Sequence, residues 1–308
     1  MDEIVTAERS DDARSFVIGG AVIPVRPLEP ALYLVATPIG NLGDVTVRAL
    51  ETFAAADIVA CEDTRVTRIL LERYGIRRKM IAYHEHNEAD AATRLVAAVQ
   101  DGRSVALASD AGTPLVSDPG YRLVQEAIKQ GVRVVPIPGA SAVLSALTVS
   151  GLPNDTFMFA GFLPVKAGQK KSRIEALADV PATLIFYESP RRLADTLEVM
   201  AAVLSDRQAV VARELTKTFE ELRRGTLPEL AAHYAESGAP KGEVVLCVAP
   251  PGERAEQSEA DTDQMLIGLA AEMSAAKAAG EAARMTGQKK SDLYQRLLKL
   301  KADNGGKG

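Results

Sequence analysis

The sequence has few of the residues that build metal centres and disulfide frameworks, and it lacks a membrane-spanning run. Only two cysteines and three histidines occur among its 308 residues. Cys61 and Cys247 each lie inside an apolar stretch, which is typical of small reduced core residues and gives no metal or disulfide spacing. No run of about 18 apolar residues is present and the chain starts with acidic residues, so we expect neither membrane insertion nor export, and a cytoplasmic location.

An excess of positive charge is also absent. The formal net charge is −5, which argues against nucleic-acid binding through overall basicity but leaves room for a local basic face. With 47% apolar residues the chain is long enough for two cores of about 110 to 150 residues each, with a small appendage.

The first half of the chain has the pattern of a parallel α/β domain. Residues 1–30 show no sustained period and predict a flexible N-terminal extension. From residue 31 to residue 150, five strand-like runs alternate with helical patterns. The strands are expected at 32–36, 58–61, 80–83, 104–108 and 132–136. Five such units predict a parallel sheet with right-handed crossovers.

The second half changes pattern after residue 150. Strand-like runs at 156–160, 182–187, 209–213 and 243–249, separated by three helical patterns, predict a second α/β or α+β domain over 151–250. Residues 251–263 hold five acids against Arg254 alone, as in a solvated linker.

The last 45 residues, 264–308, contain eight basic residues and four acids in three amphipathic patterns, with Gly280 and Gly287 as breaks. This spacing predicts a small basic helical module of the helix-turn-helix kind. A solubilising tail or a clasp between two copies of the chain is the alternative.

Polar loops follow each of the five strands in the first half. Because the carboxyl ends of parallel strands meet at one edge of a sheet, these loops should converge on one cleft. They are residues 37–44, 62–65, 84–88, 109–114 and 138–142.

The fourth of these loops, Ser109 to Pro114, has the residues of a ligand-binding turn. Gly112 permits a positive φ or a close backbone approach, and Asp110 offers an acceptor at the sheet edge. Taken alone, the same residues also fit an ordinary strand-to-helix turn.

The other loops limit the classes of reaction that the site could catalyse. The first has two glycines and Asp44 as a helix cap, but it lacks the Lys-Ser/Thr ending of a P-loop and the spacing of dinucleotide folds. ATP hydrolysis, nicotinamide chemistry and an ordinary Rossmann-type methyltransferase are therefore disfavoured. The second, 62–65, fits either substrate positioning or a helix cap with a local ion pair. His84 and His86 flank Glu85, but without a third ligand at suitable spacing a substrate-facing loop is favoured over zinc.

These five loops in this order, followed by Thr183 to Pro190 and Ala212 to Thr218, resemble the tetrapyrrole methylase superfamily. The resemblance covers about residues 31–250, and a weaker one covers the tail. It implies two α/β domains with S-adenosylmethionine in the cleft between them, and a homodimer. The residues that fall where relatives contact the cofactor are Pro38, Asp110, Ala111, Gly112, Ser141, Ala142, Glu188 and Leu215.

The charged loops at 62–65 and 84–88 place the chain with the branch of the superfamily that acts on RNA. That resemblance implies methylation of the ribose 2′-oxygen of a cytidine in the decoding centre of 16S rRNA, either as naked RNA or within the 30S subunit. Such a reaction needs alignment of the hydroxyl with the sulfonium methyl and an acceptor for its proton. The catalytic candidates are Glu62, Asp63, Arg65, His84 and Glu88.

Two other functions fit parts of the sequence. A methyltransferase acting on a precorrin would need neither RNA affinity nor a basic tail. A non-catalytic RNA-binding factor for ribosome assembly would retain the fold without the reaction.

Overall fold

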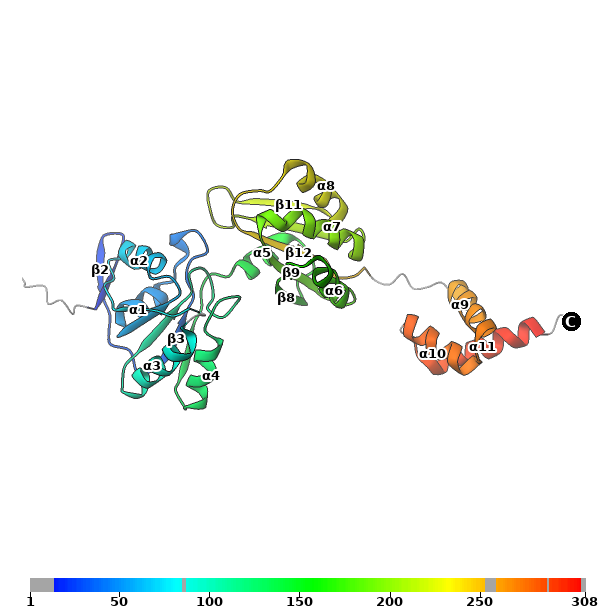
Figure 1. Cartoon of the computed structure of the whole chain (residues 1–308), viewed down its shortest axis with the longest axis horizontal. Helices are drawn as coiled ribbons and strands as arrows, with labels where there is room; N and C mark the ends of the chain where they lie inside the picture. Colours follow the sequence, from blue (N-terminus) through cyan, green and yellow to red (C-terminus); the bar gives the residue numbers. More distant parts are fainter. Residues whose placement is uncertain (1–13, 85–86, 253–258, 287, 306–308) are drawn as a thin grey trace, which may run out of the picture. The chain divides into compact units, whose positions relative to one another are not determined.

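The computed structural model of the chain describes residues 14–84, 87–252, 259–286 and 288–305 (Figure 1). The backbone separates into two compact units, residues 1–250 and 251–308. No helix in these described ranges is long and apolar enough to cross a membrane.

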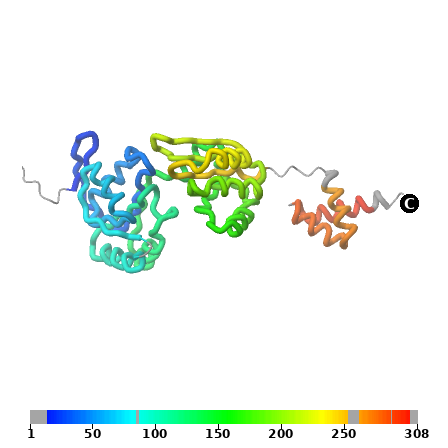
Figure 2. The backbone as a smooth tube through the Cα atoms, turned by 45° about the horizontal axis from the view of Figure 1, so that its top comes forward, coloured from blue at the N-terminus to red at the C-terminus, as the bar shows by residue number. Residues whose placement is uncertain are grey.

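A hairpin opens the described chain. Strands β1 (Ser15–Ile18) and β2 (Ala21–Pro24) pair antiparallel and appear as the dark blue loop of Figure 2. Phe16 is fully buried in a core with Leu50 and Phe53, and the Val17 N–H donates to the Tyr74 carbonyl at 2.8 Å. The expectation of a flexible extension is therefore wrong for these residues, because four-residue strands are too short to show a period and burial of Phe16 anchors the hairpin. Residues 1–13 lie outside the described residues.

The first sheet has five parallel strands in the order β5-β4-β6-β3-β7, as the alternating pattern predicted. Leu32 of β3 pairs with Val105 of β6 on one side and Val134 of β7 on the other. The strands are β3 (Leu32–Val35), β4 (Ile58–Cys61), β5 (Met80–Ala82), β6 (Val105–Ala108) and β7 (Val134–Ile137).

Helices cover both faces of this sheet (Figure 1). Alternate strand residues face opposite sides: Val59 and Cys61 pack with α1 and α2, whereas Ile58 and Ala60 pack with α3 and α4. Burial on both faces explains why the central strands β3, β4 and β6 are continuous apolar runs. The helices are α1 (Val47–Ala55), α2 (Thr64–Arg73), α3 (Glu88–Gln100) and α4 (Tyr121–Lys129).

The second sheet is mixed, with the order β11-β10-β12-β9-β8 and one parallel pair, β8 with β9. Strand β11 has the sequence ELRRGT and no apolar alternation, so the sequence pattern did not predict it; it is an edge strand, where charged side chains are tolerated. The strands are β8 (Phe157–Phe162), β9 (Thr183–Glu188), β10 (Gln208–Arg213), β11 (Glu221–Thr226) and β12 (Val244–Val248).

Helix α5 (Ala142–Ser150) joins the two halves of the first unit. Although it follows the last strand of the first sheet, its residues Val143, Ala146 and Leu147 pack on Ile185 and Cys247 of the second sheet. The opposite face of that sheet is covered by α6 (Ala167–Leu177), α7 (Leu193–Leu204) and α8 (Leu227–Ser237).

The second unit consists of α9 (Glu259–Glu272), α10 (Ala275–Thr286) and α11 (Lys290–Gly305). They share a small core that includes Leu266, Ala282 and Leu297. Gly280 lies inside α10 and is not a break, and α9 begins within the expected linker at Glu259. Residues 253–258 and Gly287 lie outside the described residues.

Candidate functional site

The order of the strands identifies where a ligand crevice opens. From β3 the chain crosses to β4, which lies on the far side of β6 in the sheet. From β6 it crosses in the other direction to β7, which lies on the far side of β3. The crossovers of two neighbouring strands thus leave in opposite directions, which opens a crevice at their carboxyl ends. The loops that begin at Thr37 and Ser109 lie on either side of this switch point.

Hydrogen bonds tie these two loops together. Thr37 and Gly112 form an isolated antiparallel bridge, with N–H to carbonyl distances of 2.9 and 3.0 Å. The Thr37 hydroxyl donates to the Ser109 carbonyl at 2.9 Å. Pro38 is buried next to this bridge.

Two more of the predicted loops join the same cluster. The Asp63 N–H, after β4, donates to Asp110 Oδ1 at 3.0 Å, and the Thr113 hydroxyl donates to the Ala140 carbonyl, after β7, at 3.2 Å. Ser141 then caps α5, which starts at Ala142. Four of the five loops therefore meet, and with them lie the predicted cofactor residues between Pro38 and Ala142.

Close backbone approaches shape the centre of the cluster. Gly112 has φ +87°, and a Cβ there would lie 3.3 Å from Ile39 Cγ2. A Cβ at Gly139 would come within 2.9 Å of Ala36 Cβ. Only glycine fits either position without movement of a neighbour.

Half-buried carboxyl groups lie at this turn. Burial, with the nearby Asp63 charge, raises the pKa of Asp110. Burial and the Asp110 charge likewise raise the pKa of Asp118, which accepts a hydrogen bond from the Ser109 hydroxyl. Burial, together with Asp118 and Glu243, raises the pKa of Tyr187 to about 12. Sequence reasoning missed Asp118 and Tyr187, although the Ser-Asp-Pro-Gly turn at 117–120 was a signal for the first.

Asp63 and Arg65 form a local ion pair at a helix cap. This is one of the two arrangements that the sequence of loop 62–65 predicted. Asp63 caps α2, accepting from the Arg65 N–H at 2.8 Å and from its guanidinium at 2.6 Å. These bonds lower the pKa of Asp63 to about 2. A carboxylate held this way is a weak proton acceptor. Glu62 is exposed beside it.

His84 and Glu88 follow β5, at the edge of the sheet. The His84 N–H donates to Asn87 Oδ1 at 2.9 Å, and Glu88 accepts from the Tyr83 hydroxyl at 3.1 Å. Arg122 Nε lies 3.7 Å from the other Glu88 oxygen. Glu85 and His86 lie outside the described residues, and among the rest no group of three or more His, Cys, Asp or Glu could hold a metal ion.

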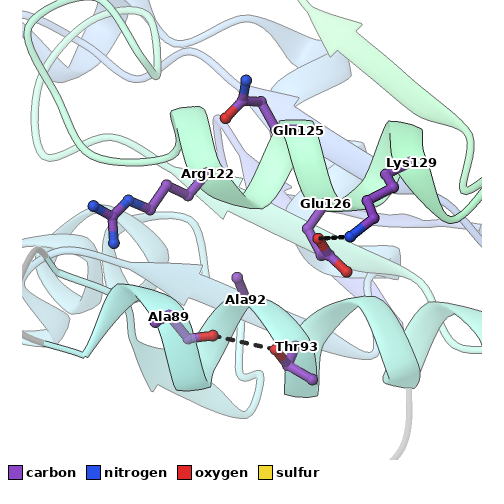
Figure 3. Close-up of a pocket in the computed structure, with 7 residues that line it drawn as sticks. All are labelled: Ala89, Ala92, Thr93, Arg122, Gln125, Glu126 and Lys129. Atoms are coloured by element: carbon purple, nitrogen blue, oxygen red, sulfur yellow. Dashed lines mark hydrogen bonds and ion pairs between the residues drawn. The ribbon is translucent and has the colours of Figure 1, made fainter.

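Arg122 also borders a groove between α3 and α4, of about 630 Å³ (Figure 3). Gln125 and Lys129 line its α4 side and Ala89 and Thr93 its α3 side. The groove contains none of the predicted site residues, and it is connected to them through the contact from Arg122 to Glu88.

Backbone strain marks two loops of the first unit. Five non-glycine residues in the described chain have positive φ, and four of them lie in the loops after β6 and β10. Such strain is concentrated at ligand sites, where the surrounding structure holds it in place. The four are Leu115 (+72°), Ser117 (+66°), Glu214 (+51°) and Thr216 (+67°).

Leu215, a predicted cofactor residue, lies between the last two of these. It is buried with Ile39 of the β3 loop and Val143 of α5. The Thr216 hydroxyl beside it is buried without a hydrogen-bond partner among the described residues.

Glu188, the remaining predicted cofactor residue, is enclosed by its own sheet and helices. Its oxygens accept from the Ser189 N–H and the Thr196 hydroxyl, each at 2.7 Å. Arg192 Nε lies 3.3 Å away, and the buried Lys170 donates to the Thr196 oxygen at 2.9 Å. A direct contact from Glu188 to the cofactor stays a prediction.

Comparison with known proteins supports a family assignment. The model of the Tetrapyrrole (Corrin/Porphyrin) Methylases matches residues 31–231, and that of the RsmI C-terminal HTH domain matches residues 256–301. The solved structure of diphthine synthase superposes with a TM-score of 0.57 at 20% identity, covering 71% of this chain and 89% of that one. The solved structure of uroporphyrin-III C-methyl transferase from Thermus thermophilus, complexed with S-adenyl homocysteine, superposes with a TM-score of 0.50 at 20% identity. It covers 70% of this chain and 96% of that one.

The fold is thus that of a tetrapyrrole methylase. A relative in Mesorhizobium japonicum, "Ribosomal RNA small subunit methyltransferase I", is 66% identical over 293 residues, covering 95% of this chain and 99% of that protein. The chain belongs to the tetrapyrrole methylase family and, within it, to the family of ribosomal RNA small subunit methyltransferase I.

The residues at the crevice fit S-adenosylmethionine. Its sulfonium and ammonium groups are cationic and its amino and hydroxyl groups donate hydrogen bonds, which suits a site with the Asp110 and Asp118 carboxyl groups. Because Gly112 has no Cβ, a ligand can approach its backbone closely.

Proposed function

We propose that this protein transfers the methyl group of S-adenosylmethionine to the ribose 2′-oxygen of a cytidine in the decoding centre of 16S rRNA. The observation that carries the proposal is the joining of four loops at the switch point of the first sheet, in a chain that is 66% identical to a ribosomal RNA methyltransferase.

The donor side of the site is proposed at the Thr37–Gly112 bridge. S-adenosylmethionine supplies an already activated methyl group. The protein therefore has to bind the donor and the acceptor, orient them and exclude water. Pro38, the Asp110 to Gly112 turn and Leu215 would hold the donor, with Ser141 and Ala142 at the start of α5. Rigid positioning there follows from the hydrogen bonds among the loops and the strained backbone on either side of Leu215.

The acceptor side is proposed at the loops after β4 and β5. Asp63 and Arg65 are suited to positioning, because their ion pair leaves Asp63 a weak base. Glu62, His84 and Glu88 are then the candidates for accepting the proton of the 2′-hydroxyl. Glu88 is held by Tyr83 and Arg122, which fixes its orientation.

Further parts of the proposal concern partners. We infer action on the 30S subunit in the cytoplasm, and a homodimer. The edge strand β8 favours an association between copies, since Phe157, Met158 and Phe162 are 43%, 39% and 57% exposed there.

One assay separates the candidate functions. Purified protein is incubated with methyl-labelled S-adenosylmethionine and either 30S subunits or a precorrin. Label in 16S rRNA, located by nuclease digestion to a 2′-O-methylcytidine, is the expected result. Label in the precorrin would replace the proposal with corrin methylation, and binding of 30S subunits without label would leave a non-catalytic assembly factor.

A further inference from the structure

A concentration of positive charge lies on α2 and the loop that follows it. Residues 64–79 contain six basic residues and a single acid, Glu72, in a protein whose net charge is −5. The C-terminal unit holds a second concentration, with five basic residues and one acid over residues 289–301.

Four of these six side chains have no internal partner in the described part of the chain. Arg68, Arg73, Arg77 and Lys79 are exposed and form no salt bridge or side-chain hydrogen bond with any described residue. Their neighbours behave differently: Arg65 is engaged by Asp63, and Arg78 Nε donates to the Ala54 carbonyl at 2.7 Å. We call these four residues the α2 basic surface.

Helix α2, which carries Arg68 and Arg73 of this surface, starts at the proposed active site. Helix α2 is capped by Asp63, whose N–H donates to Asp110 in the central turn. Its ten residues extend about 15 Å from that point. An RNA strand with one ribose at the site would therefore reach the helix within a few nucleotides.

Grooves lie on both flanks of the helix. Arg68 and Arg77 line one of about 590 Å³, together with Arg78 and Glu72. Arg73 lines another of about 620 Å³, which runs along the glycine-containing loop 40–43 to Lys217 and has no acidic side chain among its described lining residues. A polyanion can follow either flank and meet arginine guanidinium groups.

We propose that the α2 basic surface binds the phosphate backbone of the RNA substrate, an inference that rests on the proposed function. Arginine matches phosphate with two parallel hydrogen bonds, and exposed cations that are not engaged within the chain have no ion pair to break on binding. Backbone contacts of this kind position a strand without reading its bases.

The test is a triple variant, Arg68→Gln/Arg73→Gln/Arg77→Gln, of the full chain. Binding to a 16S rRNA transcript and to 30S subunits is measured over a salt series, with methyl transfer and S-adenosylmethionine affinity in parallel. We expect weaker RNA binding and a slope of log K against log salt that shrinks by about 2 to 3. KM for RNA should rise while kcat and cofactor affinity stay near wild type.

The matched control is Arg133→Gln/Lys166→Gln/Arg173→Gln, which removes the same charge from exposed residues that are spread over the first unit. Equal salt slopes for the two triple variants would overturn the proposal. Unchanged transcript binding with lost 30S binding would also overturn it, in favour of a ribosomal protein as the partner. If the wild-type protein methylates neither RNA, the proposed function itself fails, whatever the variants do.

Discussion

Gly112 is the residue on which the crevice depends most directly. Its φ of +87° is costly for any residue with a side chain, and a Cβ would also press on Ile39. We predict that Gly112→Val abolishes S-adenosylmethionine binding, by at least about 100-fold in calorimetry, which corresponds to about 2.7 kcal/mol.

The control for backbone strain alone is Gly131→Val. Gly131 has φ +70° with nothing within 4 Å of its Cβ, and it lies in the turn between α4 and β7. This variant should lose stability but keep cofactor affinity. A folded Gly112→Val protein with normal affinity would show that the ligand does not use this turn.

Asp63 and His84 carry a second prediction at the residue scale, because their loops are assigned to the acceptor side. Asp63→Asn weakens the pair with Arg65, and His84→Ala removes the imidazole. His84→Ala should lower the rate of methyl transfer by about 100-fold to 10,000-fold, the range of a positioned acid–base group. Asp63→Asn should lower it by up to about 100-fold, the loss that a misplaced substrate causes. Both variants should change cofactor affinity little. Single-turnover kinetics and calorimetry measure the two quantities. A parallel loss of cofactor binding would move that loop to the donor side.

Asp118 gives a prediction on pH. Because burial raises its pKa above the ordinary value of 3.8, its contribution to stability is fully present below that value and is lost as pH rises through the folded pKa. Asp118→Asn should therefore raise the Tm by a few degrees at pH 7, and this gain should vanish near pH 3. Asp155→Asn, which removes the same charge at an exposed position, is the control. A pH-independent effect at Asp118 would contradict the account that burial of its carboxyl group raises the pKa.

At the scale of elements, a buried polar network holds α6 and α7 to the end of β9. The Thr196 hydroxyl donates to Glu188 and accepts from Lys170, with each of these three side chains buried. Thr196→Val leaves the Glu188 carboxylate short of a donor. We expect a loss of about 1 to 3 kcal/mol in the free energy of unfolding, measured by urea denaturation.

Thr148→Val is the corresponding control. The exposed Thr148 hydroxyl donates only to carbonyls of its own helix, so the change should stay within about 0.5 kcal/mol. Similar losses in both variants would mean that the network around Glu188 contributes nothing beyond an ordinary threonine.

Elements also show how the two halves of the first unit are coupled. Helix α5 belongs to the first half by sequence but packs on the second sheet, and Arg224 of β11 donates to the Ser150 carbonyl at its end. The loops of the crevice are thus connected to both sheets by one rigid helix. A change in the packing of α5 would reach the Ser141–Ala142 start of that helix, at the proposed donor site.

At the scale of the whole molecule, the C-terminal unit forms its own core and includes none of the crevice loops. We predict that truncation after Pro250 leaves S-adenosylmethionine affinity intact while RNA affinity falls. Neutralising Lys289, Lys290 and Lys299 together should shrink the salt slope by about 0.7 to 0.9 for each phosphate that a lysine no longer neutralises.

The competing role for this unit is a clasp between copies. Truncation would then yield monomers in sedimentation velocity, with an unchanged salt slope for each active site. That outcome would remove the unit from RNA binding and leave the assignment of the crevice untouched.

The local pattern of apolar and polar residues determined the strands of the first sheet and the loops that follow them. Short, mainly apolar runs of four or five residues predicted the five strands of the first sheet. The pattern is clearest for the central strands β3, β4 and β6, because a strand buried on both faces has no polar position to interrupt it. The polar loops after those strands, including the Asp110 to Gly112 turn and the Asp63 cap, followed from the same reading. The charges of α2 and of the tail are visible in the sequence as well.

Tertiary structure alone decided the rest. The position of β3 between β6 and β7, which opens the crevice, depends on pairing between residues about 70 to 100 positions apart that no local period encodes. The packing of α5 on the second sheet, the burial of Phe16 and the approach of Asp118 to Tyr187 depend in the same way on distant partners. Periodicity reports which face of an element is apolar, but only the folded chain determines what that face contacts.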